Sequence, residues 1–468
     1  MEVIGDKSLN KPNKGRLFRR RLIAGIASAL LVIQGAGVAL PQPSYAEQAD
    51  VSVPNWYPSS VMQVPELKPV WTAQVDNYLE MNDPYVWTQA VAEEGKVFTF
   101  ADSKLIALDA KTGKKLWTYG SDLTPYVVYH DGIIYGLASN DNPYAVDAKT
   151  GKVKWQSDVS TWIDTRLRTE KLVPTADTLY VIKGSITFAF DRATGKLRWK
   201  ADEPAAEGHG TAYFEEANGV ILRTFPVQGA LSSVQLNAYD KKTGKKLWGI
   251  FGQGEVIRIK DGLVYSIDYY SQMLVDYQSI PTRKLIINAY NLKTGEKKGS
   301  REYSWTVPGE PPYEGYYYGA HMNDGKLYIN QANQIAEYDF DAYKAGLAPL
   351  RTFQQPYGDN WVLHRIAQDR LIYWNISNGE LAGTKLANGQ GVGWRGDAPV
   401  SQIDVYGKGM YRSQRNGTFL GINMLTTNVL FKVKTGADMH GTTLKTGNMI
   451  IIQAEGRLLG VKLPAALQ

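Results

Sequence analysis

One eleven-residue segment recurs along the chain, and it restricts the possible folds more than any other feature. The four full copies are ALDAKTGKKLW, AVDAKTGKVKW, AFDRATGKLRW and AYDKKTGKKLW, starting at Ala107, Ala145, Ala189 and Ala238. A fifth copy from Ala289, AYNLKTGEKKG, keeps the turn residues and lacks the tryptophan. The aspartates of the full copies lie 38, 44 and 49 residues apart. Such regularity indicates one structural unit repeated along the chain.

Each copy, here called the turn cassette, predicts a tight turn between two short strands. In the first copy, Asp109 can accept hydrogen bonds from backbone N–H groups two and three residues later, and the Thr112 hydroxyl can join it. Gly113 supplies a positive φ, and Trp117 can pack against a neighbouring sheet. The same roles are predicted for Asp147, Gly151, Trp155, Asp191, Gly195, Trp199, Asp240, Gly244 and Trp248. One carboxylate per copy, without phosphate-loop glycines, argues against a metal or phosphate site.

A second repeated element, a glycine turn followed by an apolar strand, precedes each cassette, as in KDGLVYSI from Lys260. Together the two elements predict a four-stranded antiparallel meander, and 40–50 residues are typical of one blade of a β-propeller. Nine candidate hairpins can be counted, four of them in the degenerate C-terminal half. Because rings of eight are the more usual outcome, we predict an all-β propeller of eight blades within a range of seven to nine. The last unit lacks an outer strand, and residues 71–75 are placed to close the ring by supplying it.

The first 46 residues have the features of a secretory signal. Arg16, Arg19, Arg20 and Arg21 precede the apolar run LIAGIASALLVI, and Ser44 and Ala46 suit cleavage before Glu47. An uncleaved anchor is the alternative, and the export route stays open. We therefore expect a signal at 1–46, a flexible lead at 47–69, one propeller at 70–464 and a tail at 465–468. The protein is then secreted or attached to the cell surface or cell wall.

Charge and cysteine content exclude several functions. Residues 1–46 hold seven Lys or Arg and two acidic residues, so their removal lowers the net charge from +6 to +1. This balance gives no case for nucleic-acid binding. The chain has no cysteine, which excludes disulfides, thiolate metal sites, a cysteine nucleophile, covalent haem and a lipoprotein anchor.

The repeats resemble those of the pyrroloquinoline-quinone (PQQ) propeller family, whose signature is [YA]xDxxTGxxxW. The resemblance covers residues 70–464 and implies a propeller whose tryptophans dock neighbouring blades. Some relatives are quinone- and calcium-dependent alcohol dehydrogenases, whereas others, such as the propeller lipoprotein of outer-membrane assembly, bind only protein. This chain lacks the adjacent-cysteine disulfide of the dehydrogenases, and no motif places their Asp base or calcium-ligating Glu and Asn. It also lacks the anchor of the lipoprotein.

Candidate binding residues come from the segments before the glycine turns, which a propeller places around its central channel. Rings, histidines and charges gather there, a combination that suits a polar ligand stacking on aromatic rings, such as a glycan or peptide. The predicted binding residues are Trp87, Trp162, Asp164, Arg166, His209, Arg258, Tyr316, Tyr317, His321, Trp361, His364 and His440. Taken alone, each of these histidines is more typical of a structural histidine with satisfied hydrogen bonds than of a ligand. Only His321 and His364 fall in neighbouring units, so no metal site is expected.

These observations lead to two hypotheses of different classes. The first is an exported, monomeric, non-catalytic propeller, without cofactor, that serves as a scaffold and binds a protein or a cell-wall polysaccharide at one mouth of the ring. The alternative is a PQQ- and Ca²⁺-dependent dehydrogenase of alcohols or sugars. A partner strand added to a blade rim is a third possibility. Contact with a membrane is expected only through the signal segment.

Overall fold

The computed structural model describes residues 51–53, 64–77, 90–162, 170–227, 233–273, 275–313, 319–331, 333–355, 357–358 and 360–468. The fold described below belongs to the unit Val38–Gln468. In the described ranges, no helix has the length and apolar character needed to cross a bilayer.

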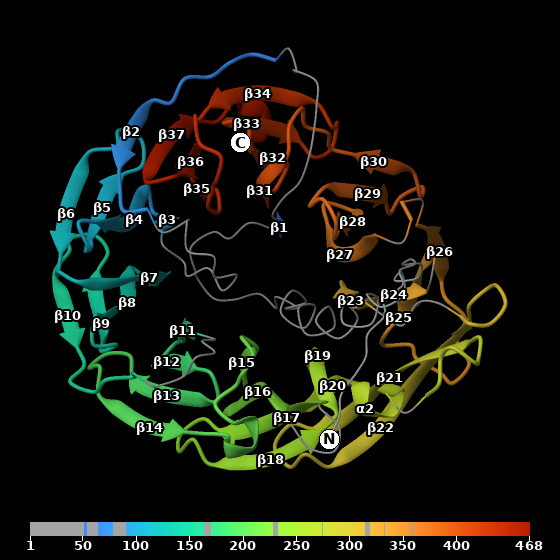
Figure 1. Cartoon of the computed structure of the whole chain (residues 1–468). Coiled ribbons are helices and arrows are strands. Elements are labelled where there is room, and N and C mark those ends of the chain that lie inside the picture. The colour runs from blue at the N-terminus through green and yellow to red at the C-terminus, as the bar shows by residue number, and fades with distance from the viewer. Residues whose placement is uncertain are drawn as a thin grey trace, which may run out of the picture. The chain divides into compact units, whose positions relative to one another are not determined.

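The described chain forms nine antiparallel sheets, which we call blades 1 to 9 (Figure 1). Blade 1 consists of β3 (Val91–Glu93), β4 (Lys96–Ala101), β5 (Lys104–Asp109) and β6 (Lys115–Tyr119). Blade 2 consists of β7 (Leu123–His130), β8 (Ile133–Ala138), β9 (Pro143–Asp147) and β10 (Val153–Gln156). Blade 3 consists of β11 (Glu170–Pro174), β12 (Thr178–Lys183), β13 (Ile186–Asp191) and β14 (Leu197–Ala201). Blade 4 consists of β15 (Phe214–Ala217), β16 (Val220–Val227), β17 (Ser233–Asp240) and β18 (Lys246–Phe251). Blade 5 consists of β19 (Gln253–Lys260), β20 (Leu263–Asp268), β21 (Thr282–Asn291) and β22 (Lys297–Thr306). Blade 6 consists of β23 (Ala320–Asn323), β24 (Lys326–Gln331), β25 (Gln334–Asp339) and β26 (Arg351–Gln354).

Blades 7 and 8 continue this order, and blade 9 joins strands from both ends of the sequence. Blade 7 consists of β27 (Trp361–Ala367), β28 (Arg370–Asn375), β29 (Leu381–Lys385) and β30 (Gly391–Gly393). Blade 8 contains β31 (Val400–Tyr406), β32 (Gly409–Gln414), β33 (Thr418–Asn423) and β34 (Val429–Lys434). Blade 9 consists of β35 (Leu444–Thr446), β36 (Met449–Ala454), β37 (Arg457–Lys462) and β2 (Trp71–Gln74). Short helices are η1 (Pro204–Ala206), α2 (Tyr269–Met273) and η2 (Ala465–Leu467).

The core lies between blades, and this arrangement closes the ring. Phe98 of blade 1 packs with Tyr129 of blade 2, and each further apolar cluster likewise joins two consecutive blades. The last cluster brings Ile451 of blade 9 against Val97 of blade 1. Figure 1 shows the first strand of each blade toward the middle of the ring and the fourth strand outside. The chain is thus an all-β propeller of four-stranded antiparallel blades, as predicted.

The ring contains nine blades, which is within the expected range but differs from the preferred count of eight. Each of the nine hairpins found in the sequence has become a blade. The preference for eight rested on how often such rings occur and not on the chain itself. The predicted closure is confirmed, because β2 pairs with β37 in register Trp71↔Gly460.

Described residues of the two terminal segments contact blades 8 and 9. Within the lead at 47–69, β1 (Val51–Val53) adds an antiparallel fifth strand to β31, with Val51 opposite Val405. Leu67 also donates its backbone N–H to Lys432 at 2.8 Å. In the tail, Leu467 is 2% exposed and packs in the apolar cluster of blades 8 and 9. Backbone pairing and apolar burial thus attach these described terminal residues to blades 8 and 9.

Each turn cassette joins the third and fourth strands of one blade, and its tryptophan contacts the next blade. Asp109 accepts from the backbone N–H groups of Lys111 and Thr112 at 3.1 and 2.8 Å and from the Thr112 hydroxyl at 2.8 Å. Gly113 has a φ of 69°. Trp117 donates its indole N–H across the seam to the Ala148 carbonyl in the next cassette, at 3.2 Å. The same seam bond is made by Trp71, Trp155, Trp199, Trp248 and Trp394.

The blade topology gives the ring two faces with different connections. The turns between first and second strands and the cassette turns all lie at one end of the blades, which we call the turn face. The loops between second and third strands lie at the other end, together with the connections between blades, and form the loop face. The bond from Thr161 N to Asp141 O, 3.1 Å long, joins two such loops.

Candidate functional site

The structure does not bring the predicted binding residues into one site. Trp87, Asp164, Arg166, Tyr316 and Tyr317 lie outside the described residues. The other seven are spread over blades 2 to 9 and over both faces. Each is best considered by what its side chain contacts.

Arg258 lies toward the turn face, away from the loop connections. Its guanidinium bonds to the Asp341 carboxylate at 3.1 Å and lies over the Phe340 ring, 5.5 Å from the centroid. Both partners belong to the cassette turn of blade 6, so Arg258 contributes to the seam between blades 5 and 6.

His321 and His364 occupy the first strands of neighbouring blades 6 and 7. Nε2 of His321 lies 3.0 Å from the Leu363 carbonyl, which ties the two strands together. His364 packs edge-on against Trp374, with ring centroids 6.2 Å apart. Burial and then the nearby His364 lower the pKa of His321 to about 4, and burial and then Arg365 do the same for His364. Both rings are therefore neutral at pH 7.

His440, His209, Trp361 and Trp162 differ in exposure. His440 is 7% exposed, bonds to the Thr435 hydroxyl at 2.8 Å, and has its pKa lowered to about 4 by burial. His209 follows η1 in the connection from blade 3 to blade 4. Trp361 is half-buried against Tyr357, with ring centroids 5.3 Å apart. Trp162 is 61% exposed on the loop face, so of the predicted residues that the structure describes it is the most accessible to a partner.

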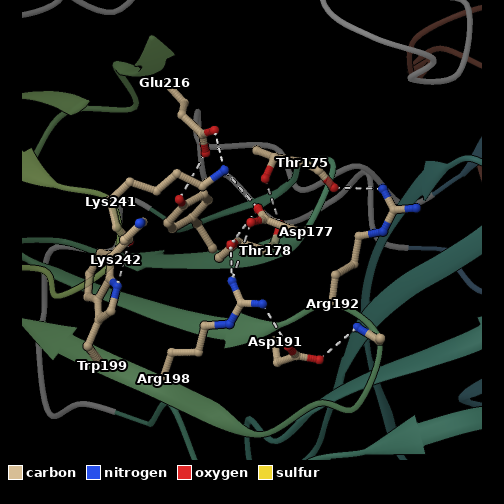
Figure 2. A network of polar contacts seen from close by, with 12 residues as sticks. Thr175, Asp177, Thr178, Asp191, Arg192, Arg198, Trp199, Glu216, Lys241 and Lys242 are labelled. Carbon is tan, nitrogen blue, oxygen red and sulfur yellow. Dashed lines mark hydrogen bonds and ion pairs between the residues drawn. The ribbon is translucent and has the colours of Figure 1, made fainter. Parts of the chain in front are cut away.

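A groove of about 410 Å³ lies at the seam between blades 2 and 3 on the turn face. Its charged lining residues are already engaged with one another or with their neighbours. Figure 2 shows Arg198 bonded to the Thr178 hydroxyl at 2.8 Å and to Asp191 at 2.6 Å. The Arg198 bond, and then that of Thr194, lower the pKa of Asp191 to about 2. Lys241 extends the network across the next seam, to Asp177 at 2.8 Å and Glu216 at 2.6 Å (Figure 2). Because these charged groups are already paired, we interpret the groove as a structural joint between blades and not as a binding site.

A different set of titratable residues gathers on the first strands of blades 4 and 5, toward the loop face. The Tyr213 hydroxyl donates to Glu215 at 2.7 Å, and the Tyr269 hydroxyl of α2 donates to Glu255 at 3.1 Å. Burial raises the pKa of Glu215 and raises that of Glu255 to about 7. The negative charge of Glu255 also reaches Tyr213. We call these four residues the acidic site.

Sequence reasoning missed the acidic site, although one signal was present. Glu215 and Glu255 each lie on the first strand of a repeat, upstream of its glycine turn. A carboxylate in such a strand becomes part-buried, and its pKa is then perturbed, which is typical of functional positions. The search had favoured histidines, arginines and rings.

An exposed apolar patch adjoins the acidic site. Its centre is the contact of Phe251, at the end of β18, with Tyr270 of α2, and Val275 and Ile280 are also exposed in the insertion between β20 and β21. Their exposed fractions are 41, 38, 37 and 40%. The rings of Phe251 and Tyr270 meet edge to face, 5.4 Å between centroids. Large exposed apolar side chains grouped in this way mark interaction surfaces.

The insertion that carries the patch is held by its own polar contacts. Asp268 bonds the backbone N–H and the hydroxyl of Ser271 at 3.0 and 2.9 Å, which secures the start of α2. Tyr313, in the connection to blade 6, donates its backbone N–H to Gln278 at 3.0 Å. The patch thus belongs to an ordered part of the loop face.

The described residues do not assemble a donor set for a quinone–calcium cofactor. No group of three or more His, Asp or Glu side chains suited to a metal ion occurs within the described ranges. A calcium ion requires six to eight oxygen ligands. The side chains described here therefore do not fit that metal, and we derive no chemical step through it.

A family model described as "outer membrane protein assembly factor BamB" matches the chain over residues 68–217 and 145–307. These two overlapping matches together span more than half of the 468 residues. They cover the closing strand β2 and blades 1 to 5, which are the blades with the turn cassettes.

Two curated proteins and a solved structure are similar to the chain. The quinoprotein ethanol dehydrogenase of Pseudomonas aeruginosa is 25% identical over 274 residues, 55% of this chain and 35% of that protein. The tetrathionate hydrolase of Acidithiobacillus ferrooxidans is 32% identical over 132 residues, 27% of this chain and 24% of that protein. The chain thus matches about a third or less of the length of either. The crystal structure of BamB from Moraxella catarrhalis aligns with 12% identity and a TM-score of 0.45, covering 84% of this chain and 99% of that one.

Proposed function

The chain belongs to the β-propeller family described as outer membrane protein assembly factor BamB, and on that premise we propose that it is a non-catalytic binding propeller. It acts outside the cytoplasm, in keeping with the signal-like segment at 1–46. Its partner is a protein, captured by the loop face of blades 4 and 5.

The observation that supports this proposal best is the exposed apolar patch on its ordered insertion. Phe251 and Tyr270 keep large rings in solvent while other aromatic residues of these blades, such as Trp248 and Tyr239, are buried. Exposing such rings has a hydrophobic cost, which a partner that covers them would remove. Aromatic residues held on a rigid frame are also the usual anchors of protein interfaces.

The test is site-specific cross-linking in the native cells. A photoreactive residue at position 270 should yield one specific adduct, which an equivalent residue at Leu116 should not give. Leu116 lies on outer strand β6 and is 44% exposed, so it matches Tyr270 in accessibility. In affinity capture, Phe251→Ser with Tyr270→Ser should lose the partner and Leu116→Ser should keep it.

The nature of the captured molecule separates the alternatives. A polysaccharide in place of a protein adduct would contradict the protein-binding proposal and favour the glycan hypothesis. Equal cross-linking from both positions would remove the loop face as the docking surface.

The dehydrogenase alternative is kept because one relative is named a quinoprotein ethanol dehydrogenase. It is tested by adding PQQ and Ca²⁺ to the purified protein. A bound quinone absorbance, together with dye reduction driven by an alcohol or sugar, would replace the binding proposal. An unchanged spectrum and no dye reduction support it.

A further inference from the structure

We infer that the acidic site is a socket for one lysine or arginine side chain of the partner protein, with Glu255 as its main contact. This inference rests on the protein-binding function proposed above. It adds a chemical specificity, because the apolar patch alone would accept many surfaces.

The geometry of Glu255 leaves one acceptor unused. Its Oε2 receives the Tyr269 hydroxyl, whereas its Oε1 is buried and has no hydrogen-bond partner. Burying a carboxylate oxygen without a hydrogen-bond donor lowers the stability of the fold, so each such atom calls for an explanation, for example a functional role. The register of β19 against β20 shifts between Gln253 and Val256, where Glu255 lies. Bulges of this kind turn a side chain out of the regular strand pattern and occur next to functional sites.

The charge around Glu255 is incomplete. Glu215 lies on the next first strand, and neither carboxylate forms an ion pair with a lysine or arginine in the described residues. Tyr269 of α2 donates to Glu255, and Tyr213, directly before β15, donates to Glu215 and lies within reach of the Glu255 charge; none of these groups is cationic. A cation placed beside Glu255 would supply a donor to Oε1 and compensate the charge of this carboxylate.

The surroundings favour a side chain of a protein over a free metal ion or amine. The rings of Tyr213 and Tyr269 border the site, and aromatic faces stabilise guanidinium and ammonium groups. Tyr269 and Tyr270 are consecutive in α2, one in the socket and the other in the apolar patch. One partner can therefore fill the socket and cover the patch in the same encounter.

The first experiment measures the socket directly on the whole mature chain. The carboxyl carbon of Glu255 is followed by NMR through a pH titration, with its signal assigned by its loss in Glu255→Gln. Millimolar Nα-acetyl-arginine amide should lower the titration midpoint by about one pH unit, and Nα-acetyl-citrulline amide should not. An unchanged midpoint with the arginine probe would overturn the inference.

The second experiment uses a short peptide that carries one arginine between apolar residues, and its citrulline counterpart. The wild-type protein should bind the arginine peptide about tenfold more tightly, since a charge-assisted hydrogen bond is worth this much or more. Glu255→Gln, which keeps the shape of the side chain, should abolish the difference. The control Glu296→Gln, at an exposed cassette turn of the same blade, should retain it. Equal binding of the two peptides by the wild type would contradict the socket.

The two proposals fail differently. If Phe251→Ser with Tyr270→Ser leaves the native partner bound while the NMR midpoint still responds to arginine, the patch is wrong and the socket stands. If the partner depends on the patch but not on Glu255, the docking surface stands and the socket is wrong.

Discussion

Blades 1 to 5 and blades 6 to 8 meet their neighbours through the same backbone position but with different side chains. In the first group each cassette receives an indole N–H at the carbonyl directly after the turn Asp or Asn, as Trp155 does at Arg192, 2.8 Å away. In blades 6 and 7 a guanidinium takes this role, from Arg301 to the Phe340 carbonyl and from Arg351 to the Leu386 carbonyl. Trp394 restores the indole at blade 8.

The turn residues change together with the donor. In blades 1 to 5 the glycine of each cassette lies under the tryptophan ring of the preceding blade, so that a Cβ at Gly151 would lie 2.7 Å from Trp117. At the seams where a guanidinium is the donor, no tryptophan ring among the described residues lies over the turn, so close packing does not require a glycine there. Phe340 fills the turn of blade 6 below Arg301, at 4.0 Å from ring centroid to guanidinium carbon, and Gly389 of blade 7 has open space beside it. The repeated turn thus keeps the position of the acceptor carbonyl, and local packing determines whether an indole or a guanidinium donates to it.

The largest expected difference is between an indole seam and a guanidinium seam. Trp155→Ala removes an 8%-exposed ring and its hydrogen bond, and should destabilise the protein by about 3–5 kcal/mol. Arg351→Ala removes a side chain that is 44% exposed, and should cost about 1 kcal/mol. Denaturant unfolding of both variants checks this, and equal losses would show that the donor type does not matter.

The second comparison is between two glycines with similar backbone conformations. Gly151 and Gly389 have φ of 72° and 73°, but only Gly151 lies against a tryptophan. Gly389→Ala should therefore cost about 1 kcal/mol for backbone strain alone. Gly151→Ala adds an overlap with Trp117 and should cost about 2–4 kcal/mol in total. Thermal unfolding of the pair gives the measurement, and a Gly151→Ala variant no worse than its partner would mean that the ring simply moves.

Acid should affect the two regions at different pH. The neutral histidines His321, His364 and His440 lie in blades 6, 7 and 9 and have pKa values of about 4, against an ordinary 6.5. Between these values the unfolded chain binds more protons, so stability falls as pH falls from 6.5 to 4. His440, the most buried, contributes at most about 3 kcal/mol.

The cassette aspartates respond only at lower pH. The Thr112 and Thr150 hydroxyls are the first cause of the lowered pKa of Asp109 and Asp147, so their contribution is lost below about pH 4. Glu255 acts in the opposite sense, because its raised pKa makes stability fall as pH rises from 4.5 to 7. Amide hydrogen exchange at pH 5 should show blades 6, 7 and 9 opening before blades 1 to 3, and the reverse order would contradict this account.

The smallest expected effect is at the turn acceptor itself. The fifth cassette already uses Asn291, whose side-chain oxygen accepts from the backbone N–H groups of Lys293 and Thr294 at 3.0 Å each. Asp109→Asn keeps these two bonds and should cost less than about 1 kcal/mol. Asp109→Ala removes them and should cost more, about 1–2 kcal/mol by analogy with helix caps. Unfolding midpoints of the two variants decide between charge and hydrogen bonding as the stabilising factor.

Local chemistry explains which parts of the fold could be predicted. The turns follow from Asp, Thr and Gly within five residues, and the closing strand follows from the missing fourth strand of the last unit. The guanidinium seams could not be predicted, because Arg301 and Phe340 meet only when two blades pack together. The pairing of β1 with β31 joins residues more than 340 positions apart, and no local pattern indicates it.

The candidate site was harder to predict for a similar reason. Histidines were chosen by residue type, yet packing made His321 and His440 neutral structural groups. The acidic site depends on contacts between β15, β19 and α2, which come from two blades and an insertion. Its residue types alone are ordinary for surface strands.

The joining of β2 to β37 has a consequence for the order of assembly. Trp71–Gln74 precedes blades 1 to 8 in the sequence, whereas the strand that receives it, Arg457–Lys462, follows all of them. Until then Trp71 cannot pair with its sheet, and the ring stays open at one junction. The ring can therefore close only after blades 1 to 8 have been made, and a chain that stops within them is left with an unpaired strand.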